Sequence, residues 1–260
     1  MKGINMDYKN LLAPVKEIAL RAGALEMQHY TDGTDVMRKG DGSPVTVADQ
    51  EAEILILDGL RALDVGLPIV AEESVAAGNV PDISKGDFWL VDPLDGTKEF
   101  VNRTGEFTVN IALMKNFKPV FGVIYAPVVD ELYSGFENGG ADLTIKDERR
   151  EISVRAVPEE GLTVVASRSH SNKEALAKFL DGRKIANTAF RGSSLKICQV
   201  ASGQADIYPR LAPTCEWDIA AGHAIVNAAG GQLTELDGRE MLYGKKDINF
   251  LNPHFLVKAA

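Results

Sequence analysis

Cysteine is scarce in this chain of 260 residues, which has only Cys198 and Cys215. Two cysteines cannot supply the disulfide framework of a small secreted protein, and no CxxC pair accompanies them as zinc ligands. No paired histidine marks either one as a nucleophile, so both are expected to be packing residues. This cysteine usage favours a reducing compartment.

Long hydrophobic runs are also missing. The longest stretch without a charged side chain, residues 219–234, is interrupted by His223, Asn227 and Gln232 and falls short of the roughly 20 apolar residues of a membrane span. Residues 1–7 are polar and lack the apolar core of a signal peptide. We therefore expect a cytoplasmic protein with no integral membrane segment, and peripheral association with the inner membrane is left open.

Positive charge is in deficit, because 28 Lys and Arg stand against 37 Asp and Glu and give a formal net charge of −9. A non-specific nucleic-acid binder needs Lys and Arg to neutralise phosphates, so nucleic acid is excluded as a partner. The same excess argues against an anionic substrate unless the acids gather around cations. With 45% hydrophobic residues the chain has globular proportions, enough for one large domain or two tightly joined halves.

Hydrophobic periodicity predicts helices at the start of the chain and strands after them. A first amphipathic helix is indicated by apolar residues at helical spacing, namely Leu11, Val15, Ile18, Ala22 and Leu25. Residues 41–49 predict a turn that feeds a second helix, with Asp49 in its first turn. The short apolar runs 68–71 and 88–91 predict strands that stop at Glu72-Glu73 and at Asp92.

The middle and the end of the chain predict a mixture of strands and helices. Residues 108–113, 120–125 and 131–136 predict an antiparallel meander, and the charge run 146–150 is expected to be a solvated loop. Strands are expected at 163–166 and 205–208, and helices at 172–180, 194–202 and 219–229, the last opened by Asp218. The fold class is therefore α/β, with helices and an antiparallel sheet in an N-terminal half, residues 1–155. A smaller α/β half, residues 156–260, completes one integrated catalytic unit.

The strongest local signal is the segment 89–100, WLVDPLDGTKEF, in which Asp95 follows Asp92 by three residues. Pro93 stiffens the chain between these acids, so both carboxylates and the Leu94 carbonyl can point at one place. An all-oxygen set of this kind suits Mg²⁺ and does not suit zinc. Gly96 lets the backbone approach a ligand closely, and the N–H groups of residues 96 and 97 can receive a phosphate oxygen.

Each acid also has a plainer interpretation. The Asp95-Gly96 pair is typical of an ordinary turn, and Asp92 of a helix cap. Asp49 and Asp218 are the first-turn acids that a helix dipole favours, and Glu72-Glu73 is a typical solvated loop end. The occurrence of all these acids in one chain is what favours a metal site.

Three segments resemble, in order, the signatures of a known family. The segments 71–74 (AEES), 92–97 (DPLDGT) and 217–222 (WDIAAG) resemble those of the lithium-sensitive, magnesium-dependent phosphatases of the inositol monophosphatase superfamily. The resemblance covers nearly the whole chain and implies a layered αβαβα sugar-phosphatase fold. The segments 98–100 (KEF), 192–196 (GSSLK) and 208–210 (YPR) resemble the 3′(2′),5′-bisphosphate nucleotidase branch, often named CysQ.

The resemblance implies a metal centre at the acids. Glu72, Asp92 and the Leu94 carbonyl would hold one Mg²⁺, and Asp92, Asp95 and Asp218 a second, so that Asp92 bridges the two ions. A third, weaker ion near Glu72 is left open, giving two or three ions in all. Paired cations of this kind clamp the attacking and leaving oxygens of an in-line displacement.

The resemblance also implies the reaction. Asp49 and the Thr97 hydroxyl match the pair that orients and deprotonates the attacking water, with no covalent phosphoenzyme. The implied reaction is hydrolysis of the 3′-phosphate of adenosine 3′,5′-bisphosphate to AMP and phosphate, with the sulfated nucleotide as a further candidate substrate. The alternative is an inositol or other sugar-phosphate phosphatase with the same metals. No obligatory protein partner is implied, and the oligomeric state is left open.

A second group of residues is implied to bind the substrate. Ser193, Ser194, Lys196 and Arg210 are candidates to hold the phosphate that is not cleaved, the lysine as a point charge and the arginine as a fork. In the plainer interpretation Ser194 caps the following helix and Lys196 is solvated. His170 resembles a residue of the adenosine pocket, although a histidine of this kind is more often simply a surface residue. On the side of the cleaved phosphate we expect Glu72, Leu94, Asp95, Gly96, Thr97 and Asp218.

Overall fold

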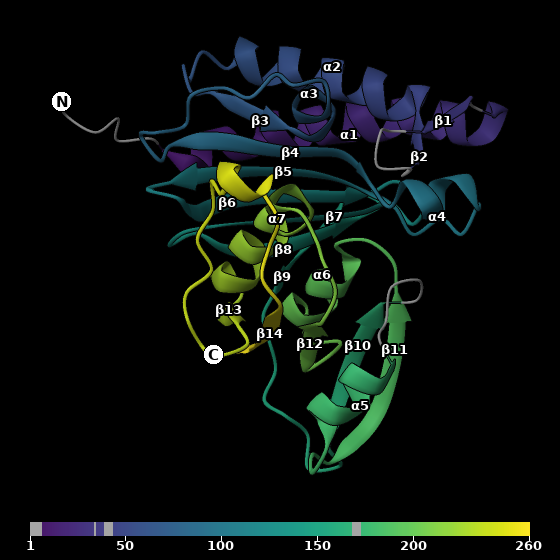
Figure 1. Ribbon diagram of the computed structural model, residues 1–260, viewed down its shortest axis with the longest axis vertical. Helices are drawn as coiled ribbons and strands as arrows, with labels where there is room; N and C mark the ends of the chain where they lie inside the picture. The colour runs from purple at the N-terminus through teal and green to yellow at the C-terminus, as the bar shows by residue number, and fades with distance from the viewer. Residues whose placement is uncertain (1–6, 34, 39–43, 168–172) are drawn as a thin grey trace.

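The computed structural model describes residues 7–33, 35–38, 44–167 and 173–260. Its elements form five layers, which follow one another from top to bottom of Figure 1 as helices, sheet, helices, sheet and helix. The first layer consists of α1 (Tyr8–Asp32) and α2 (Val47–Ala62), which pack on each other and on the larger sheet. This αβαβα arrangement confirms the predicted fold class.

The larger sheet has seven strands, of which the first pair is parallel and every later pair is antiparallel. In spatial order the strands are β3 (Ile69–Ala71), β4 (Phe88–Asp95), β5 (Thr108–Lys115), β6 (Lys118–Ala126), β7 (Glu131–Phe136), β8 (Gly140–Ile145) and β9 (Glu148–Ile152). The predicted meander is confirmed by β5, β6 and β7. The sheet is mixed rather than purely antiparallel because β3 runs beside β4 in the same direction.

Two predictions for this sheet are wrong. The run 146–150 is not a solvated loop, because residues 148–152 form β9, and only Lys146 and Asp147 make the turn, with φ of 47° and 67°. Residues 148–151 are exposed on both faces of an edge strand, so they show no apolar alternation. The second error concerns β4, which does not stop at Asp92 but continues to Asp95 with a register shift between the two.

Short elements connect these layers near the ends of the strands. A two-stranded pair, β1 (Val36–Arg38) with β2 (Pro44–Thr46), precedes α2. One-turn helices follow two strands of the larger sheet, α3 (Glu72–Ala76) after β3 and α4 (Thr97–Val101) after β4. Glu72 and Glu73, which were predicted to follow a strand end, therefore lie in a helical turn.

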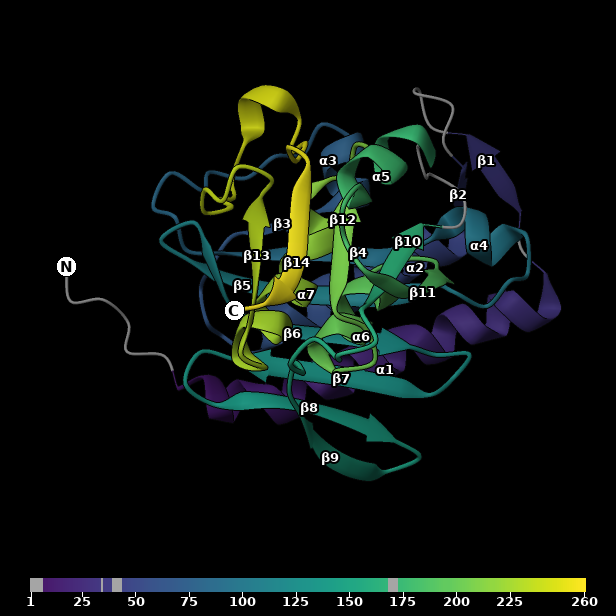
Figure 2. The same cartoon turned by 90° about the horizontal axis from the view of Figure 1, so that it is seen from below.

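The smaller sheet has five strands and carries one helix on its outer side (Figure 1). In spatial order the strands are β11 (Ile185–Arg191), β10 (Leu162–Ser167), β12 (Ile207–Arg210), β14 (Phe255–Ala259) and β13 (Gly231–Glu235). The outer helix is α5 (Lys173–Leu180), and a short 3₁₀ turn, η1 (Lys246–Ile248), precedes β14. The strands of the two sheets cross each other in projection (Figure 2).

The middle layer consists of α6 (Leu195–Ala201) and α7 (Glu216–Ala228). Helix α7 begins three residues before the predicted 219, so Asp218 lies within its first turn. A Cβ atom added to Gly122 of β6 would lie 2.3 Å from the carbonyl oxygen of Ala221, so the helix rests directly on the strand. Only glycine permits this close approach, which holds the start of α7 against the larger sheet.

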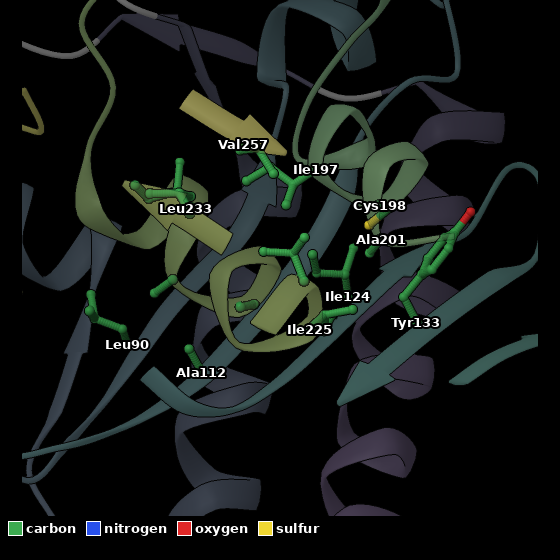
Figure 3. Packing of buried hydrophobic residues seen from close by; sticks show 14 of the residues in the cluster. Leu90, Ala112, Ile124, Tyr133, Ile197, Cys198, Ala201, Ile225, Leu233 and Val257 are labelled. Atoms are coloured by element: carbon green, nitrogen blue, oxygen red, sulfur yellow. The ribbon is translucent and has the colours of Figure 1, made fainter. Parts of the chain in front are cut away.

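The two faces of the larger sheet bury different sets of side chains. Trp89 and Val91 pack with α1 and α2, whereas Phe88 and Leu90 belong to the cluster that includes α7. Leu90 and Ala112 of the sheet belong to the same hydrophobic cluster as Ile225 of α7 (Figure 3). Because side chains alternate along a strand, Asp92 continues the row of Phe88 and Leu90 and is presented to the same side as α7.

The two halves of the chain share one hydrophobic core. The division predicted at residue 155 falls between β9 and β10, and it stays a prediction. Helix α7 from the second half packs on β4, β5, β6 and β7 of the first. Within the described residues, no helix is both long enough and apolar enough to cross a membrane.

Candidate active site

A cavity of about 280 Å³ lies where the ends of β4, β12, α3, α6 and α7 meet. Eleven of the residues predicted from sequence line it, namely Glu72, Asp92, Leu94, Asp95, Gly96, Thr97, Ser193, Ser194, Lys196, Arg210 and Asp218. The structure therefore brings together acids from both halves of the chain with two cationic side chains. His170, the remaining substrate candidate, lies outside the described residues.

Asp92 is the most deeply buried acid of the cavity, with 1% of its surface exposed. Its Oδ1 accepts a hydrogen bond from the Leu94 N–H at 3.1 Å. Burial raises the pKa of Asp92 well above its usual range, and the charges of Glu72, Asp95 and Asp218 raise it further. Like charges at such a place are costly unless cations or protons neutralise them.

Asp95 is held from the second half of the chain. Its Oδ2 accepts hydrogen bonds from Ser193 Oγ at 2.7 Å and from the Ser194 N–H at 2.6 Å. Burial raises the pKa of Asp95, while the charge of Lys196 and these hydrogen bonds oppose the increase. The Ser194 hydroxyl donates to Asn110 Oδ1 at 2.9 Å. Ser193 and Ser194 therefore both hold Asp95, and Ser194 also holds Asn110 of β5. Their contact with substrate stays a prediction.

Asp49 and Asp218 occupy equivalent positions, each at the third residue of its helix. One carboxylate oxygen of each accepts a hydrogen bond from the backbone at the start of its helix. Asp49 accepts from the Thr46 N–H at 2.7 Å, and Asp218 accepts from the Cys215 N–H at 2.9 Å. The other oxygen of Asp49 accepts from Thr97 Oγ1 at 3.0 Å. The predicted water-orienting pair is therefore in hydrogen-bond contact. Burial and the charges of the neighbouring acids raise the pKa of Asp218 well above its usual range.

Gly96 forms the tight connection between the acids and Thr97. Its φ is +99°, and a Cβ atom at this position would lie 3.0 Å from the Glu106 carbonyl oxygen. The turn thus needs glycine both for its backbone conformation and for its packing.

Lys196 and Arg210 also line the cavity and are both at least 90% buried. Lys196 Nζ donates to the Ser193 carbonyl oxygen and lies 5.6 Å from the centre of the Tyr208 ring. Burial lowers its pKa to about 8, against the opposing effect of Asp95. Arg210 donates to the carbonyl oxygens of Ala212 (3.0 Å) and Pro213 (2.8 Å). The alternative that Lys196 is simply solvated is wrong.

The donor set of the cavity fits a hard divalent cation. The groups that surround Asp92 are carboxylates and a backbone carbonyl, which are ligands for Mg²⁺ rather than for zinc. Within the described ranges, no three His, Cys, Asp or Glu side chains already close around a common point as a finished metal site.

Buried glutamates near the cavity, among them Glu53 and Glu106, were not predicted from sequence. Glu53 of α2 accepts hydrogen bonds from the start of α3, and Glu106 Oε2 accepts from the Gly192 N–H at 2.9 Å. Glu53 lies four residues after Asp49, so helical periodicity places it on the same buried face and was a usable signal. No periodic pattern marks Glu106, which lies in a loop.

Comparisons with known proteins agree with the motifs. The family model described as inositol monophosphatase family matches residues 7–257. The 3′(2′),5′-bisphosphate nucleotidase CysQ of Escherichia coli (strain K12) is 46% identical over 250 residues, covering 95% of this chain and 99% of the relative. The crystal structure of CysQ from Bacteroides thetaiotaomicron matches with a TM-score of 0.81 and 36% identity, covering 98% of this chain and 99% of that one. A Thermotoga maritima inositol monophosphatase structure matches with a TM-score of 0.77 and 27% identity, covering 96% and 92%. The chain belongs to the inositol monophosphatase family and, within it, to the CysQ branch.

Proposed function

We propose that this chain is a Mg²⁺-dependent phosphatase that hydrolyses the 3′-phosphate of adenosine 3′,5′-bisphosphate to AMP and phosphate. The observation that carries the proposal is that one cavity contains both an acidic part, the carboxylates around Asp92, and a cationic part, the buried side chains of Lys196 and Arg210. A bisphosphate has one phosphate for each part. The names of the CysQ relatives support the same substrate.

In this proposal the acidic part holds two or three Mg²⁺ ions. Their ligands are Glu72, Asp92, Asp95, Asp218 and the Leu94 carbonyl oxygen. When bound, the ions supply Lewis-acid stabilisation of phosphate charge and lower the pKa of water.

Asp49 and Thr97 orient the attacking water and take its proton. The Thr97 hydroxyl donates to Asp49 Oδ1, so its oxygen remains an acceptor for a hydrogen bond from the water. The backbone N–H and the hydroxyl of Thr46 hold Asp49 Oδ2 at 2.7 and 2.6 Å. Asp49 is thus fixed in place and accepts the proton through Thr97. Water attacks the phosphorus directly, with no covalent phosphoenzyme.

The remaining residues hold the two phosphates. Lys196 and Arg210 bind the 5′-phosphate, and the carbonyls of Ala212 and Pro213 keep the guanidinium group in one orientation. The N–H groups of Gly96 and Thr97 bind the 3′-phosphate. Because the sulfated nucleotide carries the same 3′-phosphate and a 5′-phosphate, it is a second substrate in this proposal.

A parallel assay of phosphate release tests the proposal. Adenosine 3′,5′-bisphosphate, inositol 1-phosphate and fructose 1,6-bisphosphate are compared with Mg²⁺, with and without Li⁺. We expect the highest kcat/KM for the nucleotide and inhibition by Li⁺. Preference for the inositol ester would refute the nucleotidase assignment, and no turnover of any ester would refute the enzyme.

A further inference from the structure

The one-turn helix α3, which begins at Glu72, has no cap of its own. The residue before it is Ala71, whose side chain has no hydrogen-bond acceptor. The backbone N–H groups of Glu73 and Ser74 instead donate to the two oxygens of Glu53, at 2.7 and 2.8 Å. The Ser74 hydroxyl adds a third bond at 2.6 Å. A carboxylate from α2 therefore caps α3, because it accepts the hydrogen bonds of the N–H groups at the helix start.

Glu53 reaches α3 from a buried position on a rigid support. Only 4% of its surface is exposed, and it lies one helical turn after Asp49 on the long helix α2. One face of α2 thus carries both the proposed proton acceptor and the group that fixes the segment containing Glu72. The acid also favours the helix start electrostatically, because the N-terminal end of a helix carries partial positive charge.

The side chains of α3 are only partly buried or exposed, and Val75 packs against the core. None of its five residues is fully buried, and an isolated helix of one turn has no stability of its own in water. If Glu53 released the N–H groups of residues 73 and 74, the backbone directly after Glu72 would gain conformational freedom. Any ion that needs the Glu72 carboxylate would then have to restrict that freedom on binding.

We propose that Glu53 is a positioning residue of the metal centre, which holds Glu72 ready to bind Mg²⁺ by capping α3 from the neighbouring helix. The inference rests on the proposed function, because it assumes that Glu72 is a Mg²⁺ ligand. Glu53 does not line the cavity, and it acts through the backbone of Glu73 and Ser74 and through the Ser74 hydroxyl group.

The test is Mg²⁺ binding by the full-length Glu53→Gln protein without substrate. Glutamine has the same shape but replaces one acceptor oxygen with an NH₂ group, which faces a backbone N–H and cannot accept from it. Groups that orient metal ligands typically change metal affinity by about 10- to 100-fold. We expect the Mg²⁺ concentration for half of the maximal rise in melting temperature to increase about 10-fold. In phosphate release, half-saturation by Mg²⁺ should shift equally, with kcat at saturating Mg²⁺ within about twofold of wild type.

Three further variants separate positioning from general stability. Ile56→Val removes one buried methyl group from the same helix and should lower the melting temperature without changing half-saturation by Mg²⁺. Glu53→Asp keeps the charge and should recover part of the affinity. Ser74→Ala loses one of the three bonds and should weaken Mg²⁺ binding less than Glu53→Gln. If Glu53→Gln does not fold, Ser74→Ala takes its place in the Mg²⁺-binding measurement.

The outcomes distinguish the two proposals. Wild-type protein that responds to Mg²⁺, with Glu53→Gln or Ser74→Ala half-saturating at the wild-type concentration, would overturn only the inference about Glu53. Wild-type protein that does not respond to Mg²⁺ at all would overturn the metal centre, and this inference with it.

Discussion

Asp49 and Asp218 each use one carboxylate oxygen to hold the backbone at the start of their own helix. This is the role that the plainer sequence interpretation gave them, and it does not compete with a role in the cavity. The second oxygen of Asp49 meets Thr97, and Asp218 lines the cavity beside Asp95. The helix start therefore fixes the direction of each acid, and the same residue can be structural and chemical at once.

Asp95→Asn should abolish phosphate release while preserving the fold. The asparagine carbonyl can still accept hydrogen bonds from Ser193 and Ser194, but the charge that would hold a cation is lost. We expect activity to fall by at least about 100-fold, because loss of a ligand should exceed the effect of groups that only orient ligands. Steady-state kinetics and circular dichroism melting measure the two quantities. A variant with wild-type activity would refute the two-metal assignment.

Glu26 of α1 should make the protein less stable as pH rises. It is fully buried, and neither carboxylate oxygen has a hydrogen-bond partner among the described residues. Burial raises the pKa of Glu26 well above its usual range, and the charge of Asp49 adds to this. Above the unfolded pKa of about 4.3 the folded protein binds more protons than the unfolded chain, so the free energy of unfolding declines with pH up to the folded pKa.

Urea unfolding between pH 5 and pH 8 measures this contribution. Glu26→Gln should lose part of the decline in unfolding free energy, because glutamine does not titrate. The matched control is Glu17→Gln, an exposed position on the same helix, which should retain the wild-type slope. Equal slopes for wild type and Glu26→Gln would contradict the protonated state of this side chain in the folded protein.

Among the elements, the turn from β4 to α4 constrains the cavity most tightly. Gly96→Ala places an alanine at a φ of +99° and adds a Cβ atom 3.0 Å from a backbone oxygen, and both effects destabilise the folded protein. We expect a loss of about 1–2 kcal/mol in unfolding free energy, together with reduced activity, because Asp95 and Thr97 flank the turn. Gly66→Ala is the matched control, since its φ is +70° and nothing lies within 4 Å of the added atom. Equal activity in both variants would show that the turn can relax without moving the acids.

Several elements with a strong hydrophobic pattern were predicted from sequence, whereas the polar strands β9 and β11 were not. Helices α1 and α2 and the central strands β5, β6 and β7 lie on the core and show its periodicity. Strand β11 carries mostly exposed side chains at a sheet edge, and β9 is almost wholly charged, so neither has an apolar pattern. Helix α7 was predicted to start too late because Cys215, its capping residue, is an unusual cap.

The same contrast applies to the candidate site. The acids of the cavity were recognised because they stand in short motifs that resemble a family. Glu53 stands in no such motif, and its role depends on a contact with Glu73 and Ser74, about twenty residues further along the chain. Similarly, the contact of Ser193 with Asp95 joins the two halves of the molecule. Contacts of this range follow from the packing of layers, which a single sequence does not contain.

On the scale of the whole molecule, part of the negative charge behind the net charge of −9 is gathered at one place. Asp92 and Asp95 come from β4, Glu72 from α3 and Asp218 from α7, so folding concentrates acids from distant segments in one cavity. The excess of negative charge argues against a general polyanion binder. It does not exclude a small phosphate ester, because bound cations would reverse the sign of the charge where the ester binds.

Mg²⁺ should stabilise the folded protein more at high pH than at low pH. In the metal-free protein the pKa values of Asp92 and Asp218 are raised, mainly by burial and then by the neighbouring acids. Protons therefore compete with Mg²⁺ for these carboxylates, and this competition weakens as pH rises through the folded pKa values. At a Mg²⁺ concentration of about 100 times the Kd the gain is about 2.7 kcal/mol.

Melting curves with and without Mg²⁺ at about pH 5.5 and about pH 8 test this coupling. The rise in melting temperature should be larger at the higher pH, and Asp95→Asn should show a smaller rise at both. An equal rise at both pH values would contradict competition between protons and Mg²⁺ for the same carboxylates.

The most direct measurement is the product formed from adenosine 3′,5′-bisphosphate before and after removal of Mg²⁺. Chromatography of the nucleotide identifies which phosphate has left. The account predicts AMP that carries its phosphate at the 5′ position, no turnover in the presence of a chelator, and recovery when Mg²⁺ is restored. Release of the 5′-phosphate, or undiminished turnover with the metal removed, would contradict it.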